Sequence, residues 1–345
     1  MDFLGEYGVN SGQVINKAKS QVFISRNLSY RHHLIIDLLR IPEGTAPFTY
    51  LGVPIFRGKP MVSHFQYIVD KIQLRFSSWK GSLLSMAGRL QLINSIMASM
   101  VVYSFQIYEW PVNLLRRLEV WCRNFLWSGS MDKHGVPLMA WKTCCAPMDE
   151  GGLGLKQLVV LNRSLLLKNA WEIYSSTSEG CSFLRNRFWR NGALRRSYAS
   201  SSIWSIIKRF WQQVIDNGCW LLGSNSQVAF WKDNVIGRLL NAYFGANVNI
   251  MKNTVSDFIH DGNWNLPPLL QLHFPDICEI ISRVPIAFDS HDRLIWMPST
   301  SGILTARDAY SFLRIHLPPL AWSKVIWSKF ITPRMSMLAW KVLKG

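Results

Sequence analysis

The stretch from Leu90 to Tyr108 carries no formal charge, and this feature constrains the fold of the chain most. A bilayer-spanning helix needs roughly 20 predominantly apolar residues, so the length of the stretch alone admits a membrane span. Polar side chains interrupt it, however, and each would cost free energy in hydrocarbon. They are Gln91, Asn94, Ser95, Ser99, Ser104 and Gln106. We therefore expect a helix buried inside a soluble domain, with no insertion into a membrane.

An amphipathic pattern begins after Pro111, and a Trp-Pro turn is expected to join it to the uncharged helix. Large apolar residues fall on one helical stripe, and two arginines fall on the opposite side. The stripe consists of Leu114, Leu118, Trp121 and Phe125, and the arginines are Arg116 and Arg123. This pattern predicts a second helix with one face in a core and a basic outer face.

A third helix is predicted from Ser63 to Ser78. Its apolar face consists of Phe65, Ile68, Ile72 and Phe76, with Lys71 and Arg75 along the flank. Together the three helices predict a bundle whose basic flanks either follow a phosphate backbone or are simply solvated.

The charge balance favours a polyanionic partner. The 345 residues include 38 Lys plus Arg and 21 Asp plus Glu, a formal net charge of +17. A solvated basic surface is the alternative explanation. The six cysteines form no C-x-x-C pair, and residues 1–10 resemble no secretory signal, so we expect an intracellular protein of the nucleus or cytoplasm.

The most basic segment lies between Glu179 and Asp216, where there is no acid. Seven cations occur there: Arg185, Arg187, Arg190, Arg195, Arg196, Lys208 and Arg209. Seven aromatic residues are interleaved with them: Phe183, Phe188, Trp189, Tyr198, Trp204, Phe210 and Trp211. Cations for phosphates beside rings for unstacked bases suit single-stranded or structured RNA. Equally, the segment could be a basic helical surface whose rings face the core.

Residues for catalysis or metal binding are missing from the sequence. Nucleotidyl transfer uses carboxylates that hold two divalent ions about 3.5–4 Å apart, yet no two aspartates are adjacent in this chain. Near the C-terminal end only His316 resembles a zinc ligand, whereas a structural zinc site needs four Cys/His ligands. The Gly-rich run from Gly151 to Gly154 lacks the G-K-[ST] of a phosphate loop. We therefore expect no catalytic residue, no metal or other cofactor, and no small-molecule substrate.

From Trp79 onward the chain matches a motif in order. The matching residues are Trp79, Lys80, Leu84, Ser85, Ala87, Gly88, Arg89, Leu92, Ile93, Ser95, Tyr103, Pro111, Phe125, Leu126, Trp127 and Gly129. The segment strongly resembles the region after the catalytic core in reverse transcriptases of plant LINE-type (non-LTR) retrotransposons. The resemblance extends over most of the chain and is densest from Tyr50 to Leu167.

The resemblance implies a division of the chain. Residues 1–60 would be the end of the palm with a primer-grip-like turn, and 61–130 a thumb-like helical bundle. Residues 131–220 would be a basic helical linker. Residues 221–345 would continue the linker into a truncated reverse-transcriptase zinc-binding-like domain. The expected fold class is mainly α with small β elements (α+β).

The resemblance also implies where nucleic acid would bind. In the family a lysine at the position of Lys19 helps to protonate pyrophosphate, and the turn matching Tyr50, Leu51 and Gly52 holds the primer 3′ end. The thumb positions are Lys71, Arg75, Arg116 and Arg123, and the linker positions are Arg187, Arg190 and Arg195. The expected partner is RNA or an RNA/DNA template–primer.

The family uses an adjacent Asp pair with Mg²⁺, and this chain lacks the pair. We therefore expect a non-catalytic fragment of a retrotransposon RNA-directed DNA polymerase that retains nucleic-acid binding. Two alternatives stay open: an intact reverse transcriptase whose upstream part is missing from this sequence, or a protein-interaction module that kept the fold without the ligand.

Local patterns predict the remaining elements. Strands are expected at 21–25, 293–298 and 302–305, a strand that leads into a turn at 227–234, and helices at 28–40, 156–174 and 306–313.

Overall fold

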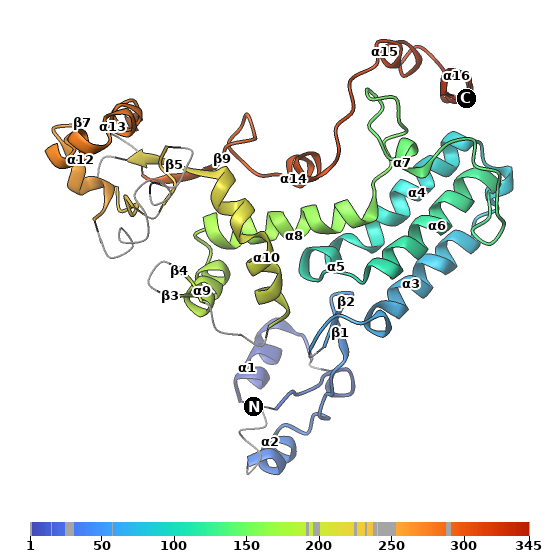
Figure 1. Cartoon of the computed structure of the whole chain (residues 1–345). Helices are drawn as coiled ribbons and strands as arrows, with labels where there is room; N and C mark the ends of the chain where they lie inside the picture. Colours follow the sequence, from blue (N-terminus) through green and yellow to red (C-terminus); the bar gives the residue numbers. More distant parts are fainter. Residues whose placement is uncertain are drawn as a thin grey trace.

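The computed structural model is mainly helical with small β elements, as the sequence predicts (Figure 1). It describes residues 2–14, 16–24, 31–56, 58–190, 193–195, 201–223, 226–231, 233–236, 240, 253–287 and 291–344. The N-terminal segment contains α1 (Asp2–Ser11), the 3-10 helix η1 (Lys17–Lys19), α2 (His32–Leu39), and the strands β1 (Phe48–Tyr50) and β2 (Val53–Ile55).

A helical bundle follows. Its elements are α3 (Val62–Ser77), the 3-10 helix η3 (Gly81–Leu83), α4 (Met86–Met100), α5 (Val102–Ile107) and α6 (Val112–Ser128). A connector with the short helix α7 (Trp141–Cys144) leads to the long helix α8 (Leu158–Ser175). The first strongly apolar run is therefore two helices and not one, because the helical hydrogen bonding of α4 ends at Val101. Val101 and Val102 are β-branched residues, which lower helix propensity at this point.

The second half of the chain starts with α9 (Glu179–Phe188), β3 (Trp189–Arg190), β4 (Ala193–Leu194), α10 (Ser202–Asn217) and β5 (Gly218–Gly223). Then come the 3-10 helix η5 (Val255–Phe258), β6 (Ile259–His260), β7 (Asn263–Trp264), α12 (Pro268–His273) and α13 (Pro275–Ser282). The last elements are β8 (Ile286–Ala287), β9 (Arg293–Trp296), α14 (Ala306–Leu313), α15 (Ser323–Ile326) and α16 (Pro333–Lys344). Strand β5 pairs in parallel with β8 and antiparallel with β9.

Several predicted elements are confirmed. Helix α14 has the predicted bounds, α8 agrees within two residues, and α3 and β9 lie where expected. Helix α2 begins later than predicted, and residues 28–30 lie outside the described residues.

Three predicted strands are wrong. Residues 21–24 form only an isolated bridge between Val22 and Glu43, next to Pro42, which has no N–H to extend a ladder; residue 25 lies outside the described residues. The described residues of 227–234 form the expected turn but not the strand before it, because the Asp233 carboxylate accepts a hydrogen bond from the Ala229 N–H (2.9 Å). Residues 302–305 form no strand because Thr305 is the N-cap of α14.

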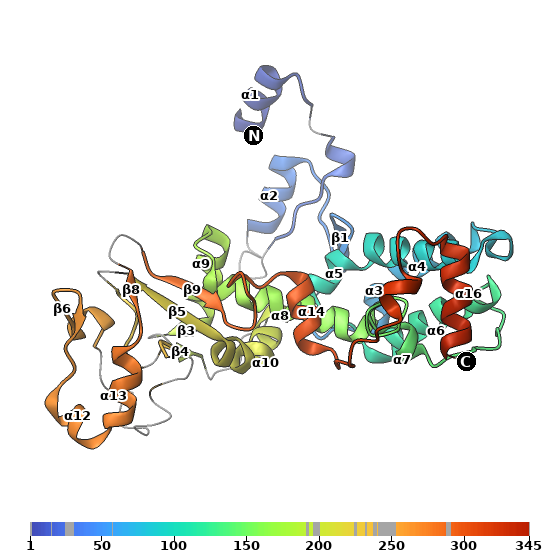
Figure 2. The ribbon, with the colours of Figure 1, turned by 90° about the horizontal axis from the view of Figure 1, so that it is seen from above.

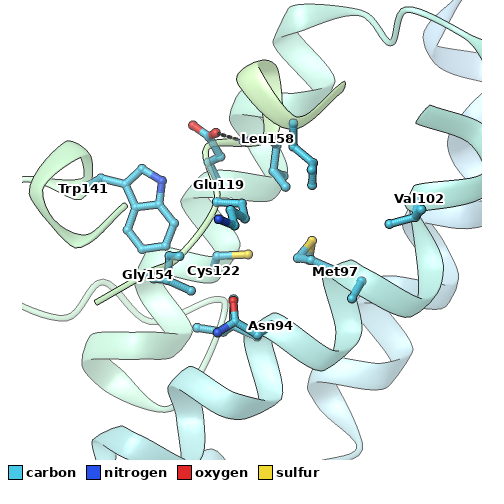
Figure 3. Close-up of a pocket in the computed structure, with 13 residues that line it drawn as sticks. Asn94, Met97, Val102, Glu119, Cys122, Trp141, Gly154 and Leu158 are labelled. Atoms are coloured by element: carbon cyan, nitrogen blue, oxygen red, sulfur yellow. Dashed lines mark hydrogen bonds between the residues drawn. The ribbon is translucent and has the colours of Figure 1, made fainter. Parts of the chain in front are cut away.

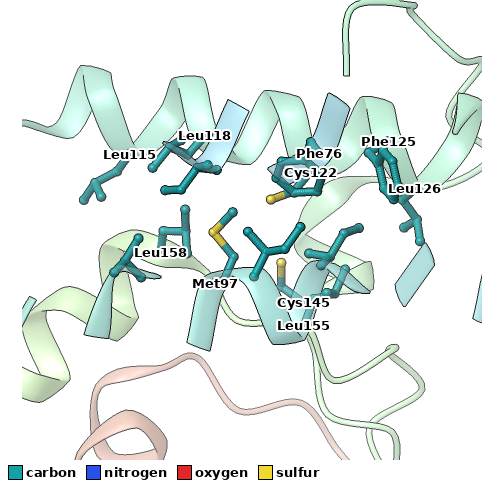
Figure 4. Packing of buried hydrophobic residues seen from close by; sticks show 14 of the residues in the cluster. Phe76, Met97, Leu115, Leu118, Cys122, Phe125, Leu126, Cys145, Leu155 and Leu158 are labelled. Carbon is teal, nitrogen blue, oxygen red and sulfur yellow. The ribbon is translucent and has the colours of Figure 1, made fainter. Parts of the chain in front are cut away.

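The largest hydrophobic cluster joins α3, α4, α5, α6 and the start of α8 (Figure 4). Its central side chains include Phe65, Leu118 and Phe125, which are almost fully buried. The cluster also contains Trp340 from α16, so the last helix packs on this bundle. In Figure 1, α8 runs from the bundle to the second half of the chain, where it contributes to another core with α10 and α14.

Two residues of the motif that begins at Trp79, Arg89 and Gly129, fix how the turns of the bundle meet. The Arg89 side chain donates to the carbonyl oxygens of Gly81 (2.8 Å), Leu126 (3.3 Å) and Trp127 (3.2 Å). It thereby satisfies carbonyls at the C-terminal end of α6, which lack partners within the helix. A Cβ atom at Gly81 would overlap the backbone of Gly129, so these two turns approach too closely for a side chain.

Asn162 on α8 fixes the end of α5. Its amide nitrogen donates to the carbonyl oxygens of Phe105 (3.0 Å) and Tyr108 (2.8 Å), and its oxygen accepts from the Trp110 N–H (3.0 Å). The Asn162 residue is buried, so the loss of this side chain would leave three polar backbone groups without a partner in the core.

We predict that Asn162→Ala lowers the free energy of unfolding by about 2–4 kcal/mol, because it orphans buried backbone groups. Asn169→Ala is the matched control, since Asn169 lies on the same helix and makes one exposed hydrogen bond, to Gln106. The control should cost no more than about 1 kcal/mol. Urea unfolding followed by circular dichroism measures both, and equal losses would contradict the role of Asn162.

A buried ion pair attaches the C-terminal segment to the connector. Arg314 donates to both carboxylate oxygens of Glu150, at 2.5 and 2.7 Å, and the Leu317 N–H donates to the same carboxylate at 3.1 Å. The Arg314 hydrogen bonds hold the pKa of Glu150 below its ordinary value, against the effect of burial. The indole N–H of Trp340 makes a further link, to the Gly151 carbonyl (2.9 Å).

We predict that Glu150→Ala destabilises the fold by about 3–5 kcal/mol, because it leaves a buried guanidinium without its counter-charge. Glu279→Ala removes an exposed ion pair with Arg283 and should cost less than about 1 kcal/mol.

The Glu150 contribution should also depend on pH. Because the folded-state pKa of Glu150 is lowered, its stabilisation is present above the ordinary glutamate pKa and is lost as the pH falls through the lower folded-state value. The free energies of unfolding of the wild type and Glu150→Ala should therefore become more alike in acid. A difference between them that does not change with pH would contradict the stabilising role of the Glu150 carboxylate.

Candidate nucleic-acid interface

The predicted primer-grip turn is the tip of a two-residue β-hairpin. Tyr50 pairs with Val53 across β1 and β2, and the two central residues have positive φ, 48° at Leu51 and 80° at Gly52. Positive φ at both positions is typical of the tight turns that match the twist of a hairpin. Asn and Gly usually occupy these positions, so Leu51 is in a strained conformation for its residue type.

The hairpin has an exposed tip and a fixed base. The Tyr50 and Leu51 residues are 62% and 82% exposed, whereas Val53 is buried. The Tyr67 hydroxyl on α3 donates to the Gly52 carbonyl, and Phe56 stacks on Tyr108 with the ring centroids 4.6 Å apart. Burial raises the pKa of Tyr67, so its hydroxyl keeps the proton that it donates in this hydrogen bond. An apolar side chain and a tyrosine ring are therefore presented to solvent on a rigid support.

A basic line on α3 starts beside this tip. Tyr67, Lys71 and Arg75 are spaced four residues apart and therefore lie along one side of the helix. The Lys71 ammonium lies 5.0 Å from the centre of the Tyr67 ring, and both cations are exposed. The neighbouring Asp70 accepts a hydrogen bond from Gln66 (2.7 Å). Here we name the hairpin tip (Tyr50, Leu51, Gly52) together with Lys71 and Arg75 the hairpin–α3 surface.

The cations predicted on α6 do not form one group. Arg117, which the sequence analysis missed, donates to Gln66 on α3 (3.2 Å) and lies 5.5 Å from the centre of the Trp121 ring. Arg116 is the adjacent residue, about 100° around the helix, and its charge acts on Glu119. Arg123 is half-buried. The four-residue spacing of Arg117 and Trp121 is a signal in the sequence that would have identified Arg117.

Lys19 lies elsewhere, as the last residue of the 3-10 helix η1 in the N-terminal segment. Its backbone N–H is bonded to Asn16, and its side chain is exposed.

In the basic linker, fewer arginine side chains are available to a ligand than its sequence indicates. Arg185 donates to the carbonyl oxygens of Ile173 (2.7 Å) and Ser176 (2.5 Å) at the end of α8, and Arg209 pairs with Glu109. Arg187 is exposed, with its guanidinium 5.9 Å from the centre of the Phe188 ring. Arg195 is also exposed.

Other linker residues lie outside the described part of the chain. Arg190 is in β3, but its side chain is not among the described ones, and Arg196 and Tyr198 lie outside the described residues altogether.

Most of the described linker aromatics are core residues. Phe188, Trp204 and Phe210 are buried, and Trp189 and Trp211 pack against Tyr174. Phe183 is 63% exposed. Of the two interpretations of this segment, the one with rings that face the core is therefore confirmed for these residues, because they fill two hydrophobic clusters.

A groove of about 360 Å³ lies between α4, α6 and the loop before α8 (Figure 3). Its lining is mostly apolar, and the Glu119 carboxylate at its edge accepts a hydrogen bond from the Leu158 N–H (2.6 Å). Burial raises the pKa of Glu119, and also that of the Cys122 thiol, which is therefore protonated at neutral pH. Glu119 serves as a cap for α8 and Cys122 as an apolar group, so the groove offers no activated nucleophile.

Metal and membrane features can be assessed only for the described ranges. Within them, no group of three or more His, Cys, Asp or Glu side chains is arranged to hold a metal ion. Across those same residues, no helix combines the length and hydrophobicity needed to cross a bilayer.

These features define a basic, mainly helical α+β protein with an exposed hairpin beside surface cations. No family model matches the chain. It is 26% identical over 307 residues to a putative ribonuclease H protein of Arabidopsis thaliana, an alignment covering 84% of this chain and 50% of that protein. The chain thus spans about half the length of this curated relative.

A second relative establishes the family. The chain is 30% identical over 111 residues to an uncharacterized mitochondrial protein of Arabidopsis thaliana, which covers 30% of this chain and 72% of that protein. The chain belongs to the family of this plant protein.

We predict that Leu51→Asn stabilises the fold by about 0.5–1 kcal/mol, because asparagine tolerates the positive φ of the turn. Val53→Asn, in the buried half of the hairpin, is the contrasting variant and should destabilise the fold. Thermal unfolding of both variants tests the turn, and a loss of stability in Leu51→Asn would show that its conformation differs from that described.

Proposed function

We propose that the chain is a transposon-derived fragment of a non-LTR retrotransposon reverse transcriptase, and that its hairpin–α3 surface binds a template–primer duplex. The main support for this proposal is the hairpin tip, which is exposed and strained and is bonded to α3, the helix that carries Lys71 and Arg75. The net charge of +17 supports a polyanionic ligand. Similarity to a protein named a putative ribonuclease H protein supports a role with nucleic acid.

The geometry suits a duplex end. Lys71 and Arg75 are separated by about 6 Å along the helix axis, which is close to the spacing of neighbouring phosphates on one strand. Their charges would neutralise the backbone, while Tyr50 and Leu51 would contact a terminal nucleotide through apolar surface. The strain at Leu51 is consistent with a position kept for contact and not for stability.

In the proposed function the chain does not itself polymerise nucleotides. The parent reaction requires carboxylates that hold Mg²⁺ ions, and the residues present do not fit them, because the sequence has no adjacent aspartates. The proposed division into a palm end (1–60), thumb (61–130), linker (131–220) and zinc-binding-like part (221–345) accompanies this function.

We predict that the double variant Lys71→Ala/Arg75→Ala weakens binding of an RNA–DNA hybrid with a recessed 3′ end. The variant loses two phosphate contacts, so the slope of log affinity against log salt should fall in magnitude by about 2. Fluorescence anisotropy at several salt concentrations measures both quantities.

The matched control is Lys324→Ala/Arg334→Ala, which removes the same two charges from exposed positions near the C-terminal end. Circular dichroism should first show that both variants are folded. If the control weakens binding as much as the α3 variant, net charge alone explains the affinity and the proposed surface is wrong.

A further inference from the structure

A second group of cations lies where three segments meet. Lys142 is on α7, Lys156 is in the loop before α8, and Arg307 is on α14; all three are exposed. The Tyr310 hydroxyl accepts a hydrogen bond from the Gln157 N–H (3.0 Å), which fixes α14 beside this loop. The Lys156 ammonium lies 4.3 Å from the centre of the Tyr310 ring. We call Lys142, Lys156 and Arg307 the connector–α14 cluster.

The nearby acids are already engaged. Glu150 is bound by Arg314, Asp308 accepts hydrogen bonds from Thr305 at the start of α14, and Glu119 accepts one from the Leu158 N–H. In the described part of the chain no carboxylate forms an ion pair with any member of the connector–α14 cluster.

The charges in this region repel one another. Lys156 is exposed as a residue, but its ammonium packs on Tyr310 and is partly desolvated there, which lowers its pKa; the positive charges of Arg314 and Arg307 lower that pKa further. Packing on Tyr310 nevertheless keeps the ammonium in place, so the fold maintains an electrostatic cost that an anion would relieve.

The shape favours an extended anion. The depression beside Lys142 and Tyr310 has a volume of about 40 Å³, well below the roughly 300 Å³ of a typical small-molecule site. The face of the Tyr310 ring is covered by Lys156, so it offers no stacking platform for a base. Exposed cations from three segments, without a pocket or a free ring, suit the phosphates of a nucleic-acid backbone.

This cluster is separate from the hairpin–α3 surface. Figure 1 shows α7 and α14 toward the top of the view and the β1–β2 hairpin lower, next to the start of α3, and Figure 2 shows α14 in front when the molecule is seen from above. We propose that the connector–α14 cluster binds the phosphate backbone of a second nucleic-acid segment, on the side of the bundle away from the hairpin. This proposal rests on the proposed function, and the experiment below distinguishes failure of the connector–α14 cluster from failure of the hairpin–α3 surface.

The experiment measures how many RNA–DNA hybrids bind to the full chain. The probe is a hybrid of about 12 base pairs, roughly 40 Å long, titrated at concentrations above the dissociation constant. The cluster variant is Lys142→Gln/Lys156→Met/Arg307→Gln, which removes three charges, and Met keeps apolar cover over Tyr310. The control is Lys324→Gln/Lys329→Met/Arg334→Gln, which has the same charge change at exposed positions.

The wild type and the control should bind two hybrids per chain, and the cluster variant should bind one. The remaining site of the cluster variant should be lost on adding Lys71→Ala/Arg75→Ala. Circular dichroism verifies folding, and the single variant Lys156→Met, which should weaken the second site alone, replaces the triple variant if that variant unfolds.

Each other outcome decides between the proposals. If the wild type binds one hybrid, and Lys71→Ala/Arg75→Ala abolishes that binding, the second site is wrong and the hairpin–α3 surface is supported. One hybrid that is lost only in the cluster variant supports the second site and overturns the first. Binding of polyglutamate but not the hybrid by the cluster would identify an acidic protein partner and overturn the nucleic-acid proposal.

Discussion

The three hydrogen bonds of Asn162 connect the parts of this molecule. Asn162 lies on α8, the helix that contributes to the bundle core at its start and to the α10–α14 core further along. By bonding the end of α5 and the turn before α6, it fixes where the uncharged segment stops being helical. The position of α6, and with it that of α3 and the hairpin, follows from this turn. A buried amide that bonds three backbone groups also specifies one register of α8 against the bundle, since any shift would leave those groups unpaired.

Sequence patterns predicted the elements that bury a regular apolar stripe. The periodic apolar residues of α3 and α6 correctly identified these helices, and the bounds of α14 were also predicted, although its N-cap Thr305 was expected in a strand. The break at Val101 was not predicted, because an apolar run has no periodicity that distinguishes one buried helix from two. The strand expected before the turn at 227–234 is absent for a different reason. The carboxylate of Asp233 bonds four residues back, and a short side-chain hydrogen bond of this kind overrides β propensity.

The candidate site was predicted less well than the fold, because a list of cations does not show which charges are already used. Arg89 and Arg185 both bond carbonyl groups at helix ends, and Arg209 pairs with Glu109. Such contacts join residues distant in the sequence, so composition cannot reveal them. The hairpin tip was foreseen from its residues, but its positive φ values and its fixation by Tyr67 required the fold. Part of the net charge of +17 thus serves contacts within the fold.

The packing of Trp340 also affects how the chain acquires its structure. The hydrogen bond from its indole to the Gly151 carbonyl joins residues 189 positions apart, and the same tryptophan is part of the bundle core. Closing so long a loop costs chain entropy before any contact is gained, and folding slows as the average sequence separation of contacts increases. During synthesis on the ribosome, α3 to α6 emerge long before α16, so the surface that Trp340 covers stays open to solvent until translation reaches this helix. Completion of the bundle therefore has to wait for α16, and until then the growing chain depends on contacts within α3 to α8.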